Sequence, residues 1–197
     1  MATKRGPRFK ECRRLGVNTC GHPKAMKRAD APAFNKRKKV SEYGLQLTEK
    51  QKVKAYYGIL DKQLRRYYEK ARAGDGVTAD KLIASLECRL DNIVYRIGFA
   101  NSIRLGRQMV THGHVLVNGR RTTYPSYAVK PGDQVELALK SRKNEHWRTN
   151  FNERCSFSLP YIIRNQEDYR GELARIPRRE EIPVQIDDHM VVEYFSR

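Results

Sequence analysis

The sequence contains two small groups of histidines and cysteines whose side chains could support catalysis or metal binding. His112 and His114 flank a single glycine, and Cys12, Cys20 and His22 lie near the N-terminus. Catalysis needs a second positioned group beside the histidine, and no carboxylate lies near His112 and His114 in the sequence. A closed structural zinc site needs four ligands, usually with tighter paired spacing. We therefore predict no catalytic residue, no metal site and no cofactor.

A second group of residues is suited to binding anions. When residues 103–112 are placed at about 100° intervals, as in a helix, one side is apolar and the other is polar. The polar side holds Arg104, Arg107, Gln108, Thr111 and His112, and no acidic residue. An ordinary solvated helix face is the alternative interpretation. Two arginines with no neighbouring acid favour a surface that binds anions.

Capping signals indicate a pair of short helices around this surface. Asp91 is a candidate N-cap for a helix over Asn92–Ile97, which Gly98 would end. Ser102 is a candidate N-cap for the second helix, which ends at Gly113.

A hairpin is predicted directly after the helix pair. Val115–Val117 and Arg120–Thr122 are its strands, because Asn118-Gly119 is the strongest two-residue turn signal. Arg120 and Arg121 extend the positive surface of the second helix. Further strands are predicted at residues 127–129 and at the alternating Val135, Leu137 and Leu139. Residues 91–140 are therefore expected to form a helix pair against a small antiparallel sheet.

The preceding segment has the periodicity of helices. Thr48 to Gln51 matches a capping box and predicts a helix that ends near Tyr57. Asp61 is a candidate cap for a second helix, and Thr78 begins a third. Four tyrosines lie at helical spacing, which favours packing over base stacking: Tyr56, Tyr57, Tyr67 and Tyr68.

The C-terminal part is less regular. Residues 156–159 and 170–176 could be strands, and periodicity leaves the apolar residues 191–195 open between helix and strand.

Charge is concentrated at the N-terminus. The 197 residues carry a formal net charge of +18, and residues 1–40 alone hold 13 basic and 2 acidic side chains. Such a segment repels itself, and a polyanion would cancel the repulsion and release counterions. No apolar run approaches the roughly 18–20 residues of a membrane span, no secretory signal is recognised, and the widely spaced cysteines indicate a reducing compartment.

Several stretches resemble one family closely. Arg89 to Ala100, Arg107 to Val115 and Val117 to Arg120 are similar to bacterial small-subunit ribosomal protein four, of the universal family. Gly6-Pro7, residues 41–45, residues 125–133, residues 140–142 and the final residues 192–197 resemble it as well, so the resemblance covers essentially the whole chain. With only Cys12 and Cys20 at the N-terminus, the chain resembles the metal-free form. Gly106 stands where the family usually has alanine, which predicts that the second helix is weaker by up to about 1 kcal/mol.

The resemblance implies an α+β fold with three parts. Residues 1–40 would be a basic extension, residues 41–86 a helical domain completed by 178–197, and residues 87–177 an inserted RNA-binding domain with helix pair, hairpin and antiparallel sheet. It implies a cytoplasmic constituent of the small ribosomal subunit that binds small-subunit rRNA directly, nucleates assembly of its 5′ domain and contributes to translational accuracy. Implied partners are neighbouring protein five and mRNA near its channel into the ribosome, with no membrane and no small-molecule substrate.

On this interpretation the RNA is recognised through its backbone and shape. Arginines would pair with phosphates, and polar side chains would bond to phosphate or sugar. The predicted RNA-binding residues are Arg104, Arg107, Gln108, Thr111, His112, His114, Asn118, Arg120 and Arg121, with Arg13, Arg14, Lys36, Arg37, Lys38 and Lys39 of the extension. The alternatives are an RNA-modifying enzyme and a stand-alone RNA-binding adaptor that use the same helix pair and hairpin.

Overall fold

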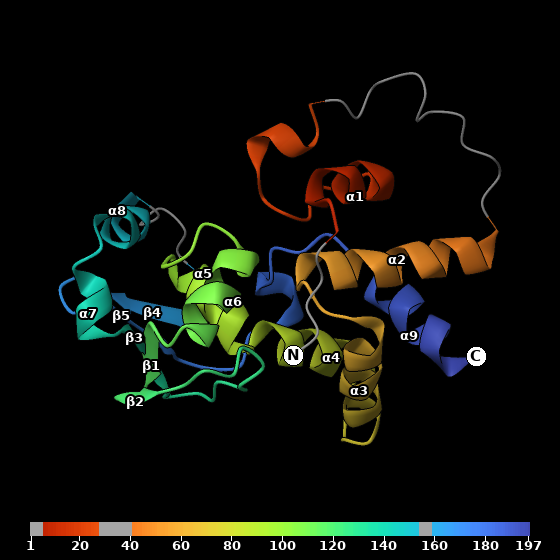
Figure 1. Ribbon diagram of the computed structural model, residues 1–197. Coiled ribbons are helices and arrows are strands. Elements are labelled where there is room, and N and C mark those ends of the chain that lie inside the picture. Colours follow the sequence, from red (N-terminus) through yellow and green to blue (C-terminus); the bar gives the residue numbers. More distant parts are fainter. Residues whose placement is uncertain (1–5, 28–40, 154–158) are drawn as a thin grey trace. The chain divides into compact units, whose positions relative to one another are not determined.

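The computed structural model describes residues 6–27, 41–153 and 159–197 (Figure 1). These residues form two compact units, each with its own core. The helical unit contains the described residues up to Ile83 together with Pro183–Arg197, and the mixed unit contains the described residues of Ala84–Ile182. The chain thus combines helices with one antiparallel sheet, which confirms the α+β class.

The helical unit is built from α-helices and one short 3-10 helix. They are α1 (Arg8–Leu15), η1 (Pro23–Ala25), α2 (Glu42–Tyr56), α3 (Asp61–Arg72), the first part of α4 (Thr78–Glu87) and α9 (Asp188–Ser196). Tyr57 and Tyr68 are buried in this unit, as their helical spacing predicted, and Tyr56 and Tyr67 are half-buried.

Two predicted caps in this unit are wrong. Helix α2 begins at Glu42, where the Ser41 hydroxyl accepts a hydrogen bond from the Gly44 amide. Thr48 lies inside the helix and donates to the Gly44 carbonyl, because the earlier serine already satisfies the helix start. Asp61 is the first residue of α3 rather than its cap, and its carboxylate pairs with Lys50 and Lys54.

The C-terminal segment is a helix, α9, that packs on α2 and α3. The Lys50 ammonium of α2 lies 4.1 Å from the ring centre of Tyr194 in a cation–π contact. The rings of Tyr68 and Phe195 stack with centres 4.8 Å apart, and Gln46 donates to Glu193. The end of the chain therefore completes the helical unit that the earlier helices begin.

The mixed unit places two short helices against a five-stranded sheet. The helices are α5 (Leu90–Ile97) and α6 (Ile103–Thr111). The strands are β1 (Val115–Val117), β2 (Arg120–Arg121), β3 (Gln134–Leu137), β4 (Ile162–Asn165) and β5 (Arg170–Leu173), in the order β2-β1-β3-β5-β4, with all neighbouring strands antiparallel. Three further helices follow β3 or β5, namely α7 (Leu139–Arg142), α8 (Glu145–Glu153) and η4 (Arg179–Glu181).

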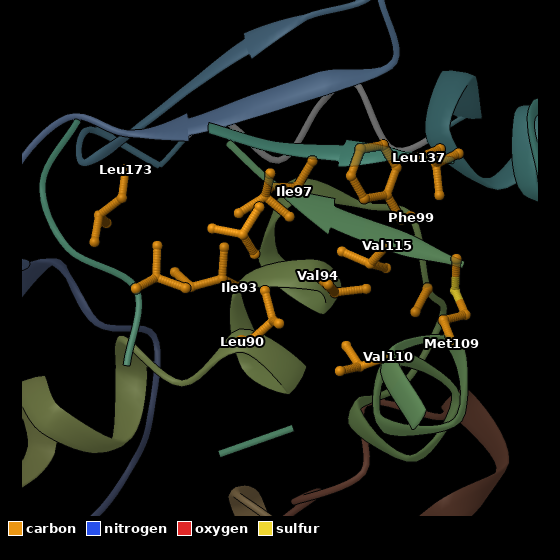
Figure 2. Close-up of a cluster of buried hydrophobic side chains, with 14 of the residues drawn as sticks. Leu90, Ile93, Val94, Ile97, Phe99, Met109, Val110, Val115, Leu137 and Leu173 are labelled. Atoms are coloured by element: carbon orange, nitrogen blue, oxygen red, sulfur yellow. The ribbon is translucent and has the colours of Figure 1, made fainter. Parts of the chain in front are cut away.

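The core of the mixed unit lies between the helix pair and the sheet. Val94 of α5, Val110 of α6 and Val115 of β1 are each fully buried in it, and Figure 2 shows these side chains gathered in one cluster. Phe99 stacks on Phe151 of α8 with ring centres 4.9 Å apart, so α8 belongs to the same core.

Several sequence predictions in this unit need correction. Asp91 lies in the first turn of α5 rather than before it, and Leu139 begins α7 instead of continuing a strand. The alternation of buried and exposed side chains along β3 ends at Leu137, because the chain turns away from the sheet there. Leu139 is therefore 74% exposed. Strand β4 and helices α7 and α8 were not predicted, and most of the proposed strand at 156–159 lies outside the described residues. Among the described helices, none is long and apolar enough to cross a lipid bilayer.

Candidate nucleic-acid interface

Helix α6 presents a polar face to solvent. Its start is fixed by Ser102, whose hydroxyl accepts a hydrogen bond from the Leu105 amide. Gly106, Met109 and Val110 are buried on one side, as the helical spacing predicted. On the other side the structure exposes four of the predicted RNA-binding residues: Arg104, Gln108, Thr111 and His112. Thr111 also donates to carbonyls of its own helix, so its hydroxyl has an intramolecular role.

Arg107 differs from these residues because it points toward α5. Only 11% of its side chain is exposed, and its Nε lies 3.9 Å from the Asp91 carboxylate. The same carboxylate accepts two hydrogen bonds from the fully buried Arg89, at 3.0 and 2.7 Å, and one from the Asn92 amide. Burial raises the pKa of Asp91, and the positive charges of Arg89 and Arg107 oppose that rise. The structure therefore gives Arg107 a place in a buried ion cluster.

The hairpin has the turn that Asn118-Gly119 predicted. Val117 faces Arg120 in the register, and both turn residues have positive φ, 49° and 75°. The Asn118 side chain is engaged within the chain. Its amide donates to Asp133 at 2.8 Å, and its carbonyl oxygen accepts from the Gln134 amide at 2.9 Å. Asn118 thus attaches the turn to the start of β3. Arg120, on the other side of the turn, is exposed to solvent.

Arg121 joins the hairpin to the end of α6. Its guanidinium donates to the His112 carbonyl at 3.1 Å, which satisfies an acceptor at the helix C-terminus. The guanidinium lies against Gly113, where a Cβ would overlap it, and Gly113 has a φ of +72°. Arg121 remains exposed to solvent. One side chain therefore both holds α6 on the hairpin and adds positive charge to their common surface.

His114 lies at the start of β1 and contacts the α7–α8 segment. Its Nδ1 is 3.0 Å from the Ser141 hydroxyl, and its ring centre is 4.4 Å from that of Trp147. Burial lowers the pKa of His114, and the neighbouring charges of His112 and Arg121 lower it further. The Ser141 side chain is buried, and its contact with His114 attaches α7 to the start of β1. Sequence reasoning missed this contact because the two residues are 27 positions apart.

We use the name α6–hairpin surface for the exposed residues Arg104, Gln108, Thr111, His112, Arg120 and Arg121. All of them lie in a stretch from residue 92 to residue 132 that contains six basic and no acidic residues. An arginine-rich surface whose own residues include no carboxylate attracts phosphates and other anions.

Two of the N-terminal candidates, Arg13 and Arg14, lie in the helical unit. Arg13 is half-buried and Arg14 is exposed, both in the last turn of α1. Lys36, Arg37, Lys38 and Lys39 lie outside the described residues. The Cys12 thiol contacts the Thr19 hydroxyl at 3.3 Å, and His22 Nδ1 accepts from the Lys24 amide. Across the described ranges, no three His, Cys, Asp or Glu side chains gather as metal ligands would.

Comparison with known proteins agrees with this architecture. Residues 3–87 match the family described as ribosomal protein S4/S9 N-terminal domain, and residues 88–135 match the S4 domain. The chain is 48% identical over 199 aligned positions to small ribosomal subunit protein uS4 of Finegoldia magna. It is 46% identical over 197 positions to small ribosomal subunit protein uS4B of Clostridium acetobutylicum. Each alignment covers 100% of both proteins, and the chain therefore belongs to the S4 family of small-subunit ribosomal proteins.

Proposed function

We propose that the chain binds small-subunit rRNA directly through the α6–hairpin surface, as a structural constituent of the small ribosomal subunit. The observation that carries this proposal is the exposed arginine-rich face of α6 and β2, within a stretch from residue 92 to 132 that has no acidic residue. Family membership makes the chain a cytoplasmic ribosomal protein, because its relatives are named as proteins of the small subunit and not as enzymes.

Recognition would rest on the backbone and shape of the RNA. A-form helices hide base edges in a deep, narrow groove, so phosphates and 2′-hydroxyls are the accessible groups. Arg104, Arg120 and Arg121 would pair with phosphates, and Gln108 and His112 would donate hydrogen bonds to phosphate or sugar. Arg107, His114 and Asn118 would act mainly by holding α6, the hairpin and α7 in position, since each bonds or pairs within the chain.

Within the subunit, the proposed role is to nucleate assembly of the 5′ domain and to contribute to translational accuracy. Binding several RNA helices at one junction would favour the assembled arrangement over the separate helices. The +11 net charge of residues 1–40 supports further RNA contacts by the extension. Neighbouring protein five and the mRNA on its path into the ribosome are the further proposed partners, as the family resemblance implies.

A binding titration against salt concentration tests the RNA contact. The purified chain is titrated with a transcript of the 5′ domain of bacterial small-subunit rRNA at several salt concentrations. The wild type should bind with a steep salt dependence. The double variant Arg104→Gln/Arg120→Gln should reduce the slope of log K against log salt by about two units in duplex regions.

A matched control changes the charge by the same amount elsewhere. Arg66 and Arg72 are exposed on α3, and the variant Arg66→Gln/Arg72→Gln should keep most of the wild-type slope. Equal slopes for both double variants would remove the α6–hairpin surface from the contact. Failure of the wild type to bind the transcript would overturn the proposal. Co-sedimentation with small subunits after a high-salt wash separates a constituent from an adaptor that dissociates.

A further inference from the structure

A loop beside the α6–hairpin surface exposes two tyrosines. Residues 122–128 follow β2, and within them 66% of Tyr124 and 37% of Tyr127 is exposed to solvent. The large aromatic residues of this unit's core have the opposite environment, since Phe99, Phe151 and Tyr161 are all fully buried. A single exposed apolar residue is ordinary on a protein surface, but this loop is also held by the backbone of α5 and flanked by basic residues.

Backbone hydrogen bonds fix the loop to the start of α5. The Tyr127 amide donates to the Tyr124 carbonyl at 3.0 Å, which closes a four-residue turn. The Asp91 amide donates to the Pro125 carbonyl, and the Leu90 amide to the Tyr127 carbonyl, at 3.1 and 2.9 Å. Pro125 itself is buried. The turn is therefore attached to the buried first turn of α5, which contains Asp91 of the buried Arg89–Asp91 pair.

The Tyr124 ring takes no part in this attachment. Over residues 6–27, 41–153 and 159–197, it makes no aromatic contact and its hydroxyl makes no hydrogen bond. A rigid backbone thus presents a large planar ring whose conformational freedom on binding is limited to two side-chain torsions. Holding an exposed aromatic in this way lowers the entropic cost of a stacking contact.

The chemical surroundings favour a nucleic-acid base as the ligand. Arg120 and Arg121 precede Tyr124 by four and three residues, and Lys130 follows it by six. Arginine and lysine would hold the phosphates on either side of a nucleotide. Proteins that bind unpaired nucleotides combine such a positive surface with aromatic rings on which the bases stack.

We propose that Tyr124 is a stacking platform for an unpaired base of the bound RNA. The inference rests on the proposed function, and it adds a contact with one extruded, unpaired nucleotide of the bound RNA. Stacking is tolerant of base identity, because every base has a π-face. The protein would therefore detect a place where pairing is interrupted, without reading which base is there.

Affinity and salt dependence together test this proposal. The variant Tyr124→Ala should bind the 5′-domain transcript about five- to hundredfold more weakly than the wild type. Its slope of log K against log salt should stay unchanged, because a neutral ring does not affect the number of counterions that binding releases. Tyr124→Phe and Tyr124→Trp should bind like the wild type, and a fully paired RNA hairpin should bind wild type and Tyr124→Ala equally.

The control variant Ile176→Ala truncates another exposed side chain of the same unit and should leave affinity unchanged. Wild-type affinity in Tyr124→Ala, or an equal loss on the paired hairpin, would overturn the stacking proposal while leaving the proposed function intact. Failure of the wild type to bind the transcript would overturn the proposed function itself.

Ultraviolet cross-linking of the wild type gives a measurement that requires no variant. A cross-link at Tyr124 supports the proposal, and cross-links confined to other residues contradict it.

Discussion

Gly106 of α6 lies directly against Asp91 of α5, and a Cβ at Gly106 would stand 2.6 Å from the Asp91 carbonyl oxygen. Because that oxygen belongs to the backbone, it cannot rotate away as a flexible side chain would. The absence of a side chain at Gly106 therefore sets how closely the two helices approach. That close approach also brings Arg107, the next residue of α6, into reach of the Asp91 carboxylate.

The variant Gly106→Ala should destabilise the mixed unit. Alanine favours an isolated helix by about 1 kcal/mol over glycine, but forcing a methyl group into a packed contact costs about 1–3 kcal/mol. We expect a net loss of about 1 kcal/mol in the free energy of unfolding, measured with urea and the fluorescence of the single tryptophan, Trp147 of α8. The control Gln108→Ala changes an exposed position of the same helix. Greater stability of Gly106→Ala would contradict the close helix contact.

Removing the charge of Asp91 should have a larger effect. Asp91→Asn leaves the fully buried Arg89 without a carboxylate, and breaking a buried pair in this way costs about 3–5 kcal/mol. The same fluorescence measurement reports the loss. Glu167→Gln is the matched control, because it removes one carboxylate from an exposed turn of the same unit. Similar stabilities of the two variants would show that the Asp91 charge contributes little.

Arg104 and Arg107 should differ in their contributions to RNA binding. Arg104 is exposed, so Arg104→Gln should reduce the salt slope by about 0.9 for a phosphate in duplex RNA. Arg107→Gln should change the slope less and lower the stability of the unit, because its guanidinium lies beside Asp91. Salt titrations combined with urea unfolding separate the two effects. The reverse order of slopes would mean that Arg107 leaves Asp91 to contact the RNA.

Stability should fall in acid partly because of His114. Its pKa is lowered in the folded state, by burial first and then by the charges of His112 and Arg121, so folding favours the neutral ring. The unfolded chain binds the proton first, near pH 6.5. The contribution is therefore present above about pH 6.5 and is lost as the pH falls through the lower folded-state pKa.

Circular dichroism during thermal unfolding measures this effect. Between pH 7.5 and 5, the wild type should lose more stability than His114→Gln. His189→Gln, at an exposed position of α9, should follow the wild type. A pH dependence that is unchanged in His114→Gln would assign the acid sensitivity to other groups.

Local signals predicted the helix pair and the hairpin well. Ser102, Gly113 and Asn118-Gly119 act through neighbouring backbone groups, so their effects can be read from adjacent residues. The start of α2 was misplaced because Thr48 carries the same kind of signal as Ser41. The choice between Ser41 and Thr48 also depends on the packing of α2 against α9, which a local sequence pattern does not contain.

The roles of individual site residues depended on tertiary contacts. Placing the residues of α6 at helical angles grouped Arg107 with Arg104. Only the position of α5 shows that Asp91 faces Arg107 and not Arg104. Likewise, Asn118 bonds Asp133 and His114 contacts Ser141 across 15 and 27 residues. Tyr124 could not be predicted from a pattern, because an exposed loop residue belongs to no periodic repeat.

The helical unit uses both ends of the chain, since α9 packs on α2 while the mixed unit lies between them in sequence. During synthesis, the ribosome releases α2 and α3 long before it translates Asp188–Ser196. Because α9 is made after the whole mixed unit, the packing of the helical unit can be completed only late in synthesis. Vectorial translation thus makes the helical unit, whose first helices emerge early, depend on a helix that is made much later.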